Sequence, residues 1–229
     1  MRKAAQTMND NTTPLSANEY DAEINKTIPF YSTFYEQTID VITQCGFPSI
    51  HWLDLGCGTG ALEERALSYF PSASFVLLDP SEKMLDQAKN KLAAYDFKYI
   101  CGKSTDINFD EEFEVVTAIQ SHHYMSAEER ECAVKKVFHA MKKDGLFVCF
   151  ENVVPSDETI KKSELLRWGR YQQRQGKTAE EALAHNARCG VSYFPLTVDA
   201  HIKLLKKTGF HAVHVFWISY MQMGIYAIK

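Results

Sequence analysis

The fold is decided by the stretch Trp52-Leu53-Asp54-Leu55-Gly56-Cys57-Gly58-Thr59-Gly60. Its first part is a short apolar run bounded by glycines, which is typical of a buried strand, and residues 61–67 have the composition of a helix. The stretch therefore predicts a strand, a glycine loop and a helix. Three glycines at alternate positions let the backbone turn tightly and let a ligand approach the N–H groups at a helix N-terminus.

Two classes of ligand use such a loop together with an acid at the end of the second strand. In a dinucleotide site the pyrophosphate lies on the helix N-terminus, and the glycine spacing is G-x-G-x-x-G. Here the spacing is G-x-G-x-G, and Asp54 precedes the loop. A carboxylate there would repel a pyrophosphate but suits the ammonium and sulfonium charges of S-adenosylmethionine. Asp79, which ends the second strand, can accept both ribose hydroxyls. We therefore predict S-adenosyl-L-methionine as the cofactor.

Apolar runs alternate with amphipathic helical stretches along the rest of the chain. Further strands are predicted at residues 75–79, 97–101, 113–119, 146–151, 212–218 and 223–228. Strands that are continuously apolar require a parallel sheet covered on both faces. The short connection from Ser219 to Gln222 makes the last two strands an antiparallel hairpin. The sequence therefore predicts a doubly wound α/β fold with a mostly parallel sheet.

Four regions are predicted: an N-terminal helical lid, a cofactor-binding core, a helical insertion over the active site and the end of the core sheet, at residues 1–45, 46–151, 152–196 and 197–229. In the lid, Pro29 separates a short helix from a longer one. In the insertion, helical segments at 157–175 and 178–188 follow each other with no strand between them.

Composition narrows the possible partners. The chain has 229 residues, 25 basic against 29 acidic side chains and a net charge of -4. It has no long run of lysine or arginine that could bind nucleic acid, so a small-molecule substrate is expected and a nucleic acid is not. The six cysteines form no C-x-x-C pair, which fits a reducing cytoplasm. No apolar run is long enough to span a membrane, and none resembles a signal peptide.

Over residues 28–229 the chain resembles the class I S-adenosylmethionine-dependent methyltransferases. Residues 54–60 look like the first motif of that family, and Leu78-Asp79-Pro80-Ser81-Glu82-Lys83-Met84-Leu85 looks like the second. The resemblance implies a Rossmann-like, seven-stranded sheet whose last strand is antiparallel. It implies that the glycine loop passes under the methionine part and that Pro80 and Met84 flank the adenine. Lys103 stands where that family more often has an acid, so Ser104 or Thr105 is expected to meet the adenine edge.

A narrower resemblance is to the carboxy-S-adenosylmethionine synthases of tRNA wobble-uridine modification, through residues 28–32, 188–197 and 201–229. Tyr31 and Arg188 fall where that family has a tyrosine and an arginine that hold the cofactor. Its asparagine after the fourth strand appears here as Ile119 or is displaced to Gln120. A guanidinium fork suits a carboxylate on a modified cofactor or an acidic substrate. The predicted cofactor-binding residues are Tyr31, Asp54, Gly56, Cys57, Gly58, Gly60, Asp79, Pro80, Met84, Ser104, Thr105 and Gln120.

Methyl transfer is an in-line displacement, so the protein chiefly aligns the nucleophile and, where necessary, accepts its proton. The candidates follow the fourth strand, because ligands of open α/β sheets bind outside the carboxyl ends of the strands. His122 and His123 occur there, and in an extended segment they would point to opposite sides. We predict His122 as the general base or orienting group. Glu151, which ends the fifth strand, is predicted as a base or a ligand of an amine, and the alternative is a structural carboxylate.

The insertion and the last strands supply aromatic and basic side chains near the same edge. An apolar pocket with a few basic groups suits an aromatic or carboxylate-bearing small molecule. The predicted substrate-binding residues are His123, Arg167, Tyr171, Arg188 and Trp217. No metal is expected, because His211 and His214 would lie on opposite faces of a strand.

Three hypotheses follow for the function. The first is a methyltransferase that acts on a small molecule, and the second is a synthase that converts the cofactor itself with prephenate. The third is a non-catalytic S-adenosylmethionine-binding protein that acts through a partner. A homodimer is compatible with each of them. The acceptor molecule and the acceptor atom stay open at this point.

Overall fold

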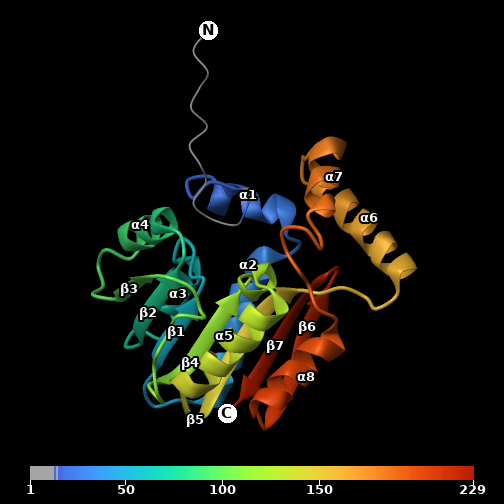
Figure 1. Ribbon diagram of the computed structural model, residues 1–229. Helices are drawn as coiled ribbons and strands as arrows, with labels where there is room; N and C mark the ends of the chain where they lie inside the picture. Colours follow the sequence, from blue (N-terminus) through green and yellow to red (C-terminus); the bar gives the residue numbers. More distant parts are fainter. Residues whose placement is uncertain (1–12, 14) are drawn as a thin grey trace.

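The computed structural model, which describes residue 13 and residues 15–229, has a seven-stranded sheet between two layers of helices (Figure 1). The first part of the predicted lid, residues 1–12 and 14, lies outside the described residues. The strand order is β3-β2-β1-β4-β5-β7-β6. The strands are β1 (His51–Leu55), β2 (Ser74–Asp79), β3 (Lys98–Cys101), β4 (Phe113–Ile119), β5 (Met141–Asn152), β6 (Ala212–Ser219) and β7 (Gln222–Ile228).

The central strand β1 determines where a ligand can bind. It pairs in parallel with β2 on one side and β4 on the other, so the strand order reverses at this point. The glycine loop after β1 therefore lies at the topological switch point, where open α/β sheets bind their ligands. At the other end of the sheet, β7 runs antiparallel to both β5 and β6. The predicted doubly wound, mostly parallel sheet with an antiparallel last strand is confirmed.

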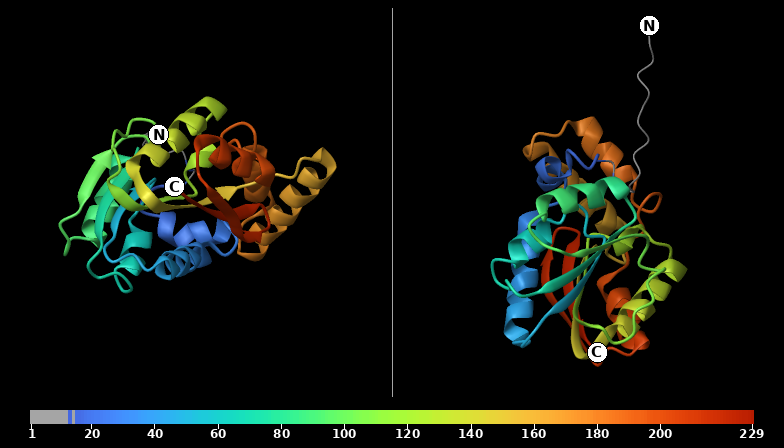
Figure 2. Two further views of the ribbon diagram at one scale, coloured as in Figure 1. Left: turned by 90° about the horizontal axis from the view of Figure 1, so that it is seen from below. Right: turned by 90° about the vertical axis from the view of Figure 1, so that its left-hand side faces the viewer.

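Helices cover both faces of the sheet (Figure 2). They are α1 (Tyr20–Thr27), α2 (Tyr31–Cys45), α3 (Ala61–Ala66), α4 (Glu82–Lys91), α5 (Ala127–Ala140), α6 (Glu158–Arg174), α7 (Ala179–Ala187) and α8 (Val198–Thr208), with a 3-10 turn η1 (His122–Tyr124) after β4. Apolar residues of α2, α3 and α4 pack on one face, and those of α5 and α8 pack on the other.

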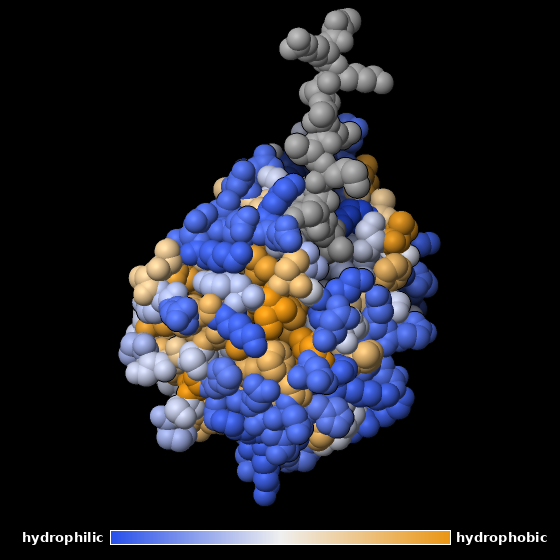
Figure 3. Space-filling model, turned by 60° about the vertical axis from the view of Figure 1, so that its left-hand side comes forward, coloured by the Kyte–Doolittle hydropathy of each residue, from blue (hydrophilic) through white to orange (hydrophobic). Residues whose placement is uncertain are grey.

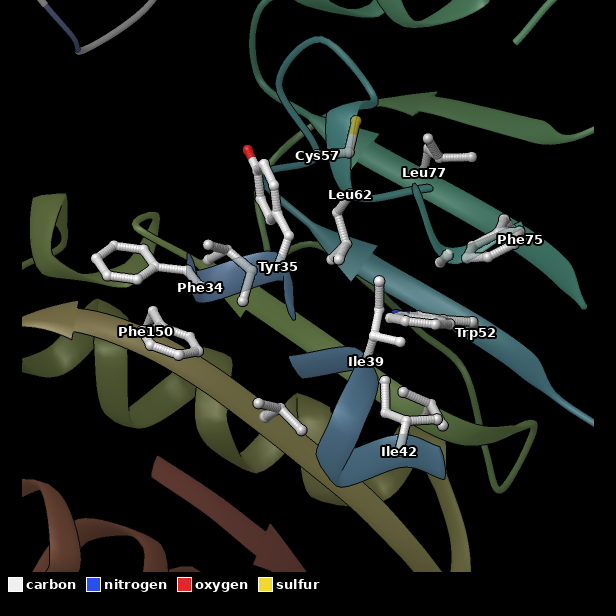
Figure 4. Close-up of a cluster of buried hydrophobic side chains, with 14 of the residues drawn as sticks. Phe34, Tyr35, Ile39, Ile42, Trp52, Cys57, Leu62, Phe75, Leu77 and Phe150 are labelled. Carbon is white, nitrogen blue, oxygen red and sulfur yellow. The ribbon is translucent and has the colours of Figure 1, made fainter. Parts of the chain in front are cut away.

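The two cores use alternate residues of the same strands. Trp52 of β1 belongs to the cluster under α2, whereas its neighbour Leu53 belongs to the cluster under α5 and α8. Figure 4 shows α2 side chains directed at the sheet, and the rings of Phe34 and Phe150 stack with centroids 4.4 Å apart. Both faces of the central strands are thus buried, as the continuous apolar runs predict.

Helices α1, α6 and α7 lie beyond the carboxyl edge of the sheet (Figure 1). The Trp168 indole N–H of α6 donates to the Thr27 carbonyl oxygen at 2.7 Å, and the Tyr171 hydroxyl donates to the Asn25 carbonyl oxygen at 2.9 Å. The two helices predicted at 157–175 and 178–188 form as α6 and α7. These contacts connect the insertion to the short helix α1.

The fifth strand begins earlier than predicted. It starts at Met141, directly after α5, and not at residue 146. Met141 is buried and pairs with Phe113, and the register shifts before Val115 pairs with Leu146. A Cβ on Gly145 would lie 2.8 Å from the Lys142 carbonyl oxygen, so the glycine permits this irregularity. Burial of Met141 and the bulge at Gly145 account for the longer strand.

The surface is mostly hydrophilic, as expected for a chain with many charged side chains. Hydrophilic residues dominate the face shown in Figure 3, and apolar residues form only small areas between them. Among the helices of the described residues, none is long and apolar enough to cross a membrane.

Candidate active site

A cavity of about 200 Å³ opens at the carboxyl ends of β1, β2 and β4. Eight of the predicted cofactor-binding residues line it: Gly56, Gly58, Asp79, Pro80, Met84, Ser104, Thr105 and Gln120. Asp79 is fixed by two backbone donors, since the Gly58 N–H and the Ser81 N–H each lie 2.9 Å from one of its carboxylate oxygens. The structure thus brings most of the predicted cofactor residues together around one cavity.

The glycines of the loop serve different purposes. A Cβ on Gly56 would lie 2.5 Å from the Ser121 Cβ, and the residue has a φ of +84°, so only glycine fits against the end of β4. A Cβ on Gly58 would meet no atom within 4 Å, because this residue borders the open cavity. Gly60 packs against α4 and lines none of the cavities described here. A ligand can therefore approach the backbone at Gly58.

A second, smaller cavity of about 20 Å³ lies behind the loop. It is lined by the other predicted cofactor residues, Tyr31, Asp54 and Cys57, and also by Tyr20 and Tyr35. The Tyr35 hydroxyl donates to the Tyr31 hydroxyl oxygen at 2.9 Å, and the Tyr20 hydroxyl lies 3.2 Å from the same oxygen. Three tyrosines in mutual contact therefore form part of the wall of this cavity.

Asp54 is buried beside a second acid that the sequence does not single out, Glu63 of α3. Asp54 accepts a hydrogen bond from the Thr117 hydroxyl. Burial, with a smaller contribution from Asp79, raises the pKa of Asp54 to about 6. Burial and the nearby Asp54 also raise the pKa of Glu63 well above its ordinary value. The Asp54 and Glu63 side chains share a hydrogen bond, so one of the two carboxyls carries a proton.

These features fit S-adenosylmethionine. The buried Asp54 carboxylate before the glycine loop suits the ammonium and the sulfonium of that cofactor. Gln120, at the end of β4, has a left-handed backbone with a φ of 56°, and its buried amide nitrogen has no partner among the described residues. Such an unpartnered donor at the cavity wall is available to a ligand.

A third cavity, of about 30 Å³, lies next to the cofactor cavity, between α1, η1 and the end of α7. Tyr20, Gln120 and Tyr124 line both cavities, so a molecule in one would lie against a molecule in the other. The predicted substrate residues His123 and Arg188 line the small cavity, together with His185 and Tyr193. We call this space the acceptor cavity.

The acceptor cavity combines one cation with aromatic walls. The Arg188 guanidinium carbon lies 6.0 Å from the centroid of the Tyr193 ring. Burial raises the pKa of Tyr124, and the nearby Arg188 charge opposes that shift. Burial and the charge of Arg188 lower the pKa of His185 to about 3, so this imidazole is neutral at pH 7. Arg188 therefore brings a positive charge among neutral aromatic groups.

Glu151 is the centre of a second buried polar cluster. The His122 backbone N–H donates to its Oε1 at 3.1 Å, and the His123 Nδ1 lies 3.1 Å from its Oε2. Burial alone would raise the pKa of Glu151, but the His123 hydrogen bond and the nearby charges of His122, His123 and His201 lower it to about 2. Glu151 is therefore an ionised carboxylate at every pH where the protein is expected to work.

The backbone expected at His122 and His123 requires correction. His122 and His123 lie in the 3-10 turn η1 and not in an extended segment. The His122 Nε2 lies 3.2 Å from the Ser104 hydroxyl oxygen, and its ring lines a small space with Arg130 and His201 under α5 and α8. Burial is the main cause that lowers the pKa of His122 to about 4. His123, not His122, borders the acceptor cavity.

Three predicted substrate residues lie outside the cavities. Arg167 is exposed, pairs with Glu164 at 2.8 Å and lies over the Tyr220 ring at 4.1 Å. The Tyr171 hydroxyl is occupied by α1, as described above. Trp217 packs edge-on against Phe34 with ring centroids 5.1 Å apart. The insertion and the last strands were predicted to bring these side chains to the edge over the cofactor, but cation–π contact, a hydrogen bond to α1 and core packing direct them elsewhere.

Tyr20 is the main site residue that the sequence did not indicate. It is the first residue of α1 and lines the cofactor cavity, the cavity behind the loop and the acceptor cavity. Its only sequence signal is its position near the start of a predicted helix. Within the described residues, no group of three or more potential metal ligands is placed to hold a metal ion.

Comparisons with known proteins agree with this geometry. Residues 53–145 match the sequence model of a family described as a methyltransferase domain. The carboxy-S-adenosyl-L-methionine synthase of Nautilia profundicola is 24% identical over 200 residues, which cover 87% of this chain and 86% of that protein. The synthase of Nitratiruptor sp. is 26% identical over 196 residues, which cover 85% and 82%. A solved methyltransferase structure from Thermotoga maritima superposes with a TM-score of 0.61 and 15% identity, covering 93% and 95%.

The sheet order, the glycine loop and the matching domain define a class I S-adenosylmethionine-dependent methyltransferase, with S-adenosyl-L-methionine as its cofactor. Within that class, the chain is similar over most of its length to the carboxy-S-adenosyl-L-methionine synthases. The predicted fold, enzyme class and cofactor are confirmed.

Proposed function

We propose that the enzyme methylates a small aromatic molecule that bears a carboxylate. The observation that carries the proposal is the acceptor cavity, in which Arg188 is surrounded by aromatic side chains directly beside the cofactor cavity. A guanidinium forms two parallel hydrogen bonds with a carboxylate, which fixes both the position and the orientation of the ligand. At about 30 Å³ the cavity would have to widen to admit an aromatic acid, and through Gln120 and Tyr124 it adjoins the larger cofactor cavity.

The cofactor residues divide by the part of S-adenosylmethionine that they would hold. Asp54, Tyr31 and the loop residues Gly56, Cys57 and Gly58 would bind the methionine part, Asp79 the ribose, and Pro80, Met84, Ser104 and Thr105 the adenine. Gln120 borders both cavities and would orient the two ligands. Gly60 contributes by allowing α4 to pack behind the loop. When bound, the cofactor supplies a methyl group on a positively charged sulfur.

The test is methyl transfer to a defined panel. S-adenosylmethionine with a labelled methyl group is incubated with 2-hydroxybenzoate, 2-aminobenzoate and the corresponding amides, which lack the carboxylate. We expect transfer to the acids and not to the amides. Arg188→Ala should lower kcat/KM about 30-fold, because the ligand carboxylate loses its partner. Arg170→Ala, at an exposed arginine of α6, is the matched control and should behave as wild type.

The outcome separates a methyltransferase from a non-catalytic protein. Equal transfer to the amides would contradict the role of Arg188. Cofactor binding without transfer to any acceptor would favour the non-catalytic S-adenosylmethionine-binding protein.

A carboxy-S-adenosylmethionine synthase-like reaction with prephenate is the second candidate. The observation that favours it is the similarity to such synthases over more than four fifths of the chain, together with Tyr31 and Arg188 beside the cofactor site. Incubation with S-adenosylmethionine and prephenate, followed by mass spectrometry of the cofactor, is decisive. A carboxylated cofactor would establish this reaction, and its absence with prephenate would remove it.

We also propose how the regions cooperate. The helical lid (residues 1–45) and the helical insertion (residues 152–196) would close over the substrates, since α1 contacts both the cavities and α6. The core would comprise residues 46–151 and 197–229. The six cysteines are free thiols, which supports a reducing compartment such as the cytoplasm. The charge of -4 argues against a nucleic-acid partner.

A homodimer is the remaining part of the proposal. The arm formed by α6 and α7 exposes the apolar side chains Ile160, Leu166 and Leu183, each more than half accessible. A second copy of the chain could cover them. Light scattering coupled to gel filtration would give the mass, and a monomer at micromolar concentration would reject the dimer.

A further inference from the structure

The pair formed by His123 and Glu151 is not explained by cofactor binding. Both side chains are almost fully buried, at 2% and 1% accessible, and they are joined by the 3.1 Å contact between Nδ1 and Oε2. Glu151 belongs to the long strand β5, and its other oxygen is held by the His122 backbone N–H. The backbone hydrogen bond therefore fixes the orientation of the carboxylate that contacts the imidazole. His123 also borders the acceptor cavity.

This contact determines which ring nitrogen carries the proton. An ionised carboxylate only accepts hydrogen bonds, so the Nδ1 facing Glu151 must carry a hydrogen. In the neutral imidazole the other nitrogen, Nε2, then has a free lone pair. Nε2 lies on the side of the ring away from Glu151. The arrangement thus leaves a proton acceptor on a residue that lines the acceptor cavity.

We propose that His123 is the general base of the reaction and that Glu151 is its positioning residue. The inference rests on the proposed methyl transfer to a small acceptor. As the bond between the acceptor atom and the methyl carbon forms and the bond from that carbon to sulfur breaks, the proton of the acceptor O–H or N–H passes to the His123 Nε2. The sulfur becomes a neutral thioether, and His123 becomes an imidazolium stabilised by Glu151. The acceptor therefore has an O–H or N–H group near its carboxylate.

Other groups around His123 permit this role. The titratable and charged side chains on the elements around His123 are Tyr20 on α1, Tyr124 and His122 in η1, Arg130 on α5, His185 and Arg188 at α7, Tyr193 after it, and His201 on α8. Burial lowers the pKa of His201 to about 4, and that of His122 to about the same value, so both are neutral near pH 7. Arg188 would be neutralised by the acceptor carboxylate, which leaves Glu151 to stabilise the imidazolium.

The first test reads the ring nitrogens directly and needs no turnover. Long-range proton–nitrogen spectra of the protein with S-adenosylhomocysteine are recorded, and the His123 signals are assigned by their loss in His123→Gln. We expect the hydrogen on Nδ1 in the wild type. In Glu151→Gln the amide can donate to Nδ1, so we expect the hydrogen to move to Nε2. A hydrogen on Nε2 in the wild type would overturn the inference.

The second test uses the labelled-methyl assay at saturating cofactor with 2-hydroxybenzoate and 2-aminobenzoate. His123→Gln should lower kcat about 100-fold, within the range of general base catalysis, and Glu151→Gln roughly tenfold. His139→Gln, at an exposed histidine of α5, is the matched control and should behave as wild type.

Two results would reject the inference. One is a His123→Gln variant with the wild-type kcat, and the other is an equal loss in His122→Gln, whose ring lies outside the acceptor cavity. Failure of the wild type to methylate any acid would count against the proposed function alone. The position of the ring hydrogen would still decide the inference.

Discussion

Two buried carboxylates on either side of β4 have opposite environments. Asp54 of β1 lies beside Glu63, and burial raises its pKa to about 6. Glu151 of β5 is equally buried, yet the imidazoles around it lower its pKa to about 2. The difference is the presence of partners within the fold. Glu151 already has hydrogen-bond donors supplied by the chain, whereas Asp54 borders the small cavity behind the glycine loop.

This comparison indicates what each acid is for. A buried carboxylate is costly unless a cation or hydrogen-bond donors compensate its charge, and at Asp54 a bound ligand can supply such a cation. Asp54 and Glu63 are therefore suited to receive the charged end of S-adenosylmethionine. Glu151 is suited to fix the orientation of its neighbours. The predictions below test this distinction, beginning with the largest effect.

Removing Glu151 should destabilise the protein most. In Glu151→Ala, the His122 N–H and the His123 ring lose their acceptor, and Arg130 nearby loses a compensating charge. Each buried donor left without an acceptor in this way costs about 1–3 kcal/mol. Urea unfolding measures the change in the free energy of unfolding. Glu158→Ala, at an exposed acid of α6, is the control. If both variants lose the same small amount of unfolding free energy, Glu151 has no structural role.

Neutralising Asp54 should weaken cofactor binding without weakening the fold. Asp54→Asn keeps the shape and the acceptor for the Thr117 hydroxyl but removes the charge. We expect the Kd for S-adenosylmethionine to rise about 100-fold, which corresponds to about 2.7 kcal/mol. Titration calorimetry measures the Kd, and urea unfolding should show unchanged or increased stability. Glu64→Gln, at an exposed neighbour of Glu63, is the control. If Asp54→Asn is destabilised but binds S-adenosylmethionine with the wild-type Kd, Asp54 has a structural role and not a role in cofactor binding.

The affinity for the cofactor should depend on pH through Asp54. Its folded pKa is raised to about 6, so the ionised form that attracts the ammonium is lost as the pH falls through that value. Above pH 6 the Kd should be constant, and below it the Kd should rise about tenfold per unit, because a proton competes with the cofactor. For the folded protein alone the sign is opposite, since a raised acid pKa makes it less stable as pH rises toward 6. Calorimetry between pH 5 and 8 checks this, and a flat profile would exclude Asp54 as the titrating group.

The sequence was sufficient where the signal is local. The glycine loop, Asp54 and Asp79 are contiguous with two apolar strands, so their placement at the switch point follows from the order of elements. The alternation of apolar runs and amphipathic helices likewise determines the sheet. These features depend on neighbours in the chain and not on contacts made at a distance.

The sequence was insufficient where a side chain depends on tertiary packing. Glu63 stands next to Glu64 and Arg65 in a helix that looks solvent-exposed, and only the packing of α3 on β1 buries it. The 3-10 turn after β4 exchanges the expected positions of His122 and His123. Tyr20 reaches the cavities only because α1 folds over the edge of the sheet. No periodicity in the sequence encodes these three arrangements.

A third carboxylate, on the surface, gives the smallest expected effect and completes the comparison. Asp21 of α1 accepts from the Lys91 ammonium at 2.8 Å and from the Thr59 hydroxyl at 2.7 Å, which connects the lid to the glycine loop. Its side chain is half exposed, so Asp21→Asn should change the free energy of unfolding by less than about 0.5 kcal/mol. If these contacts hold α1 over the cavities, the dissociation rate of S-adenosylmethionine should nevertheless rise by roughly twofold to threefold. Stopped-flow displacement measures that rate, and Asp40→Asn on α2 is the exposed control. A large loss of stability would mean that Asp21, like Glu151, stabilises the fold. An unchanged dissociation rate would mean that α1 does not retain the cofactor.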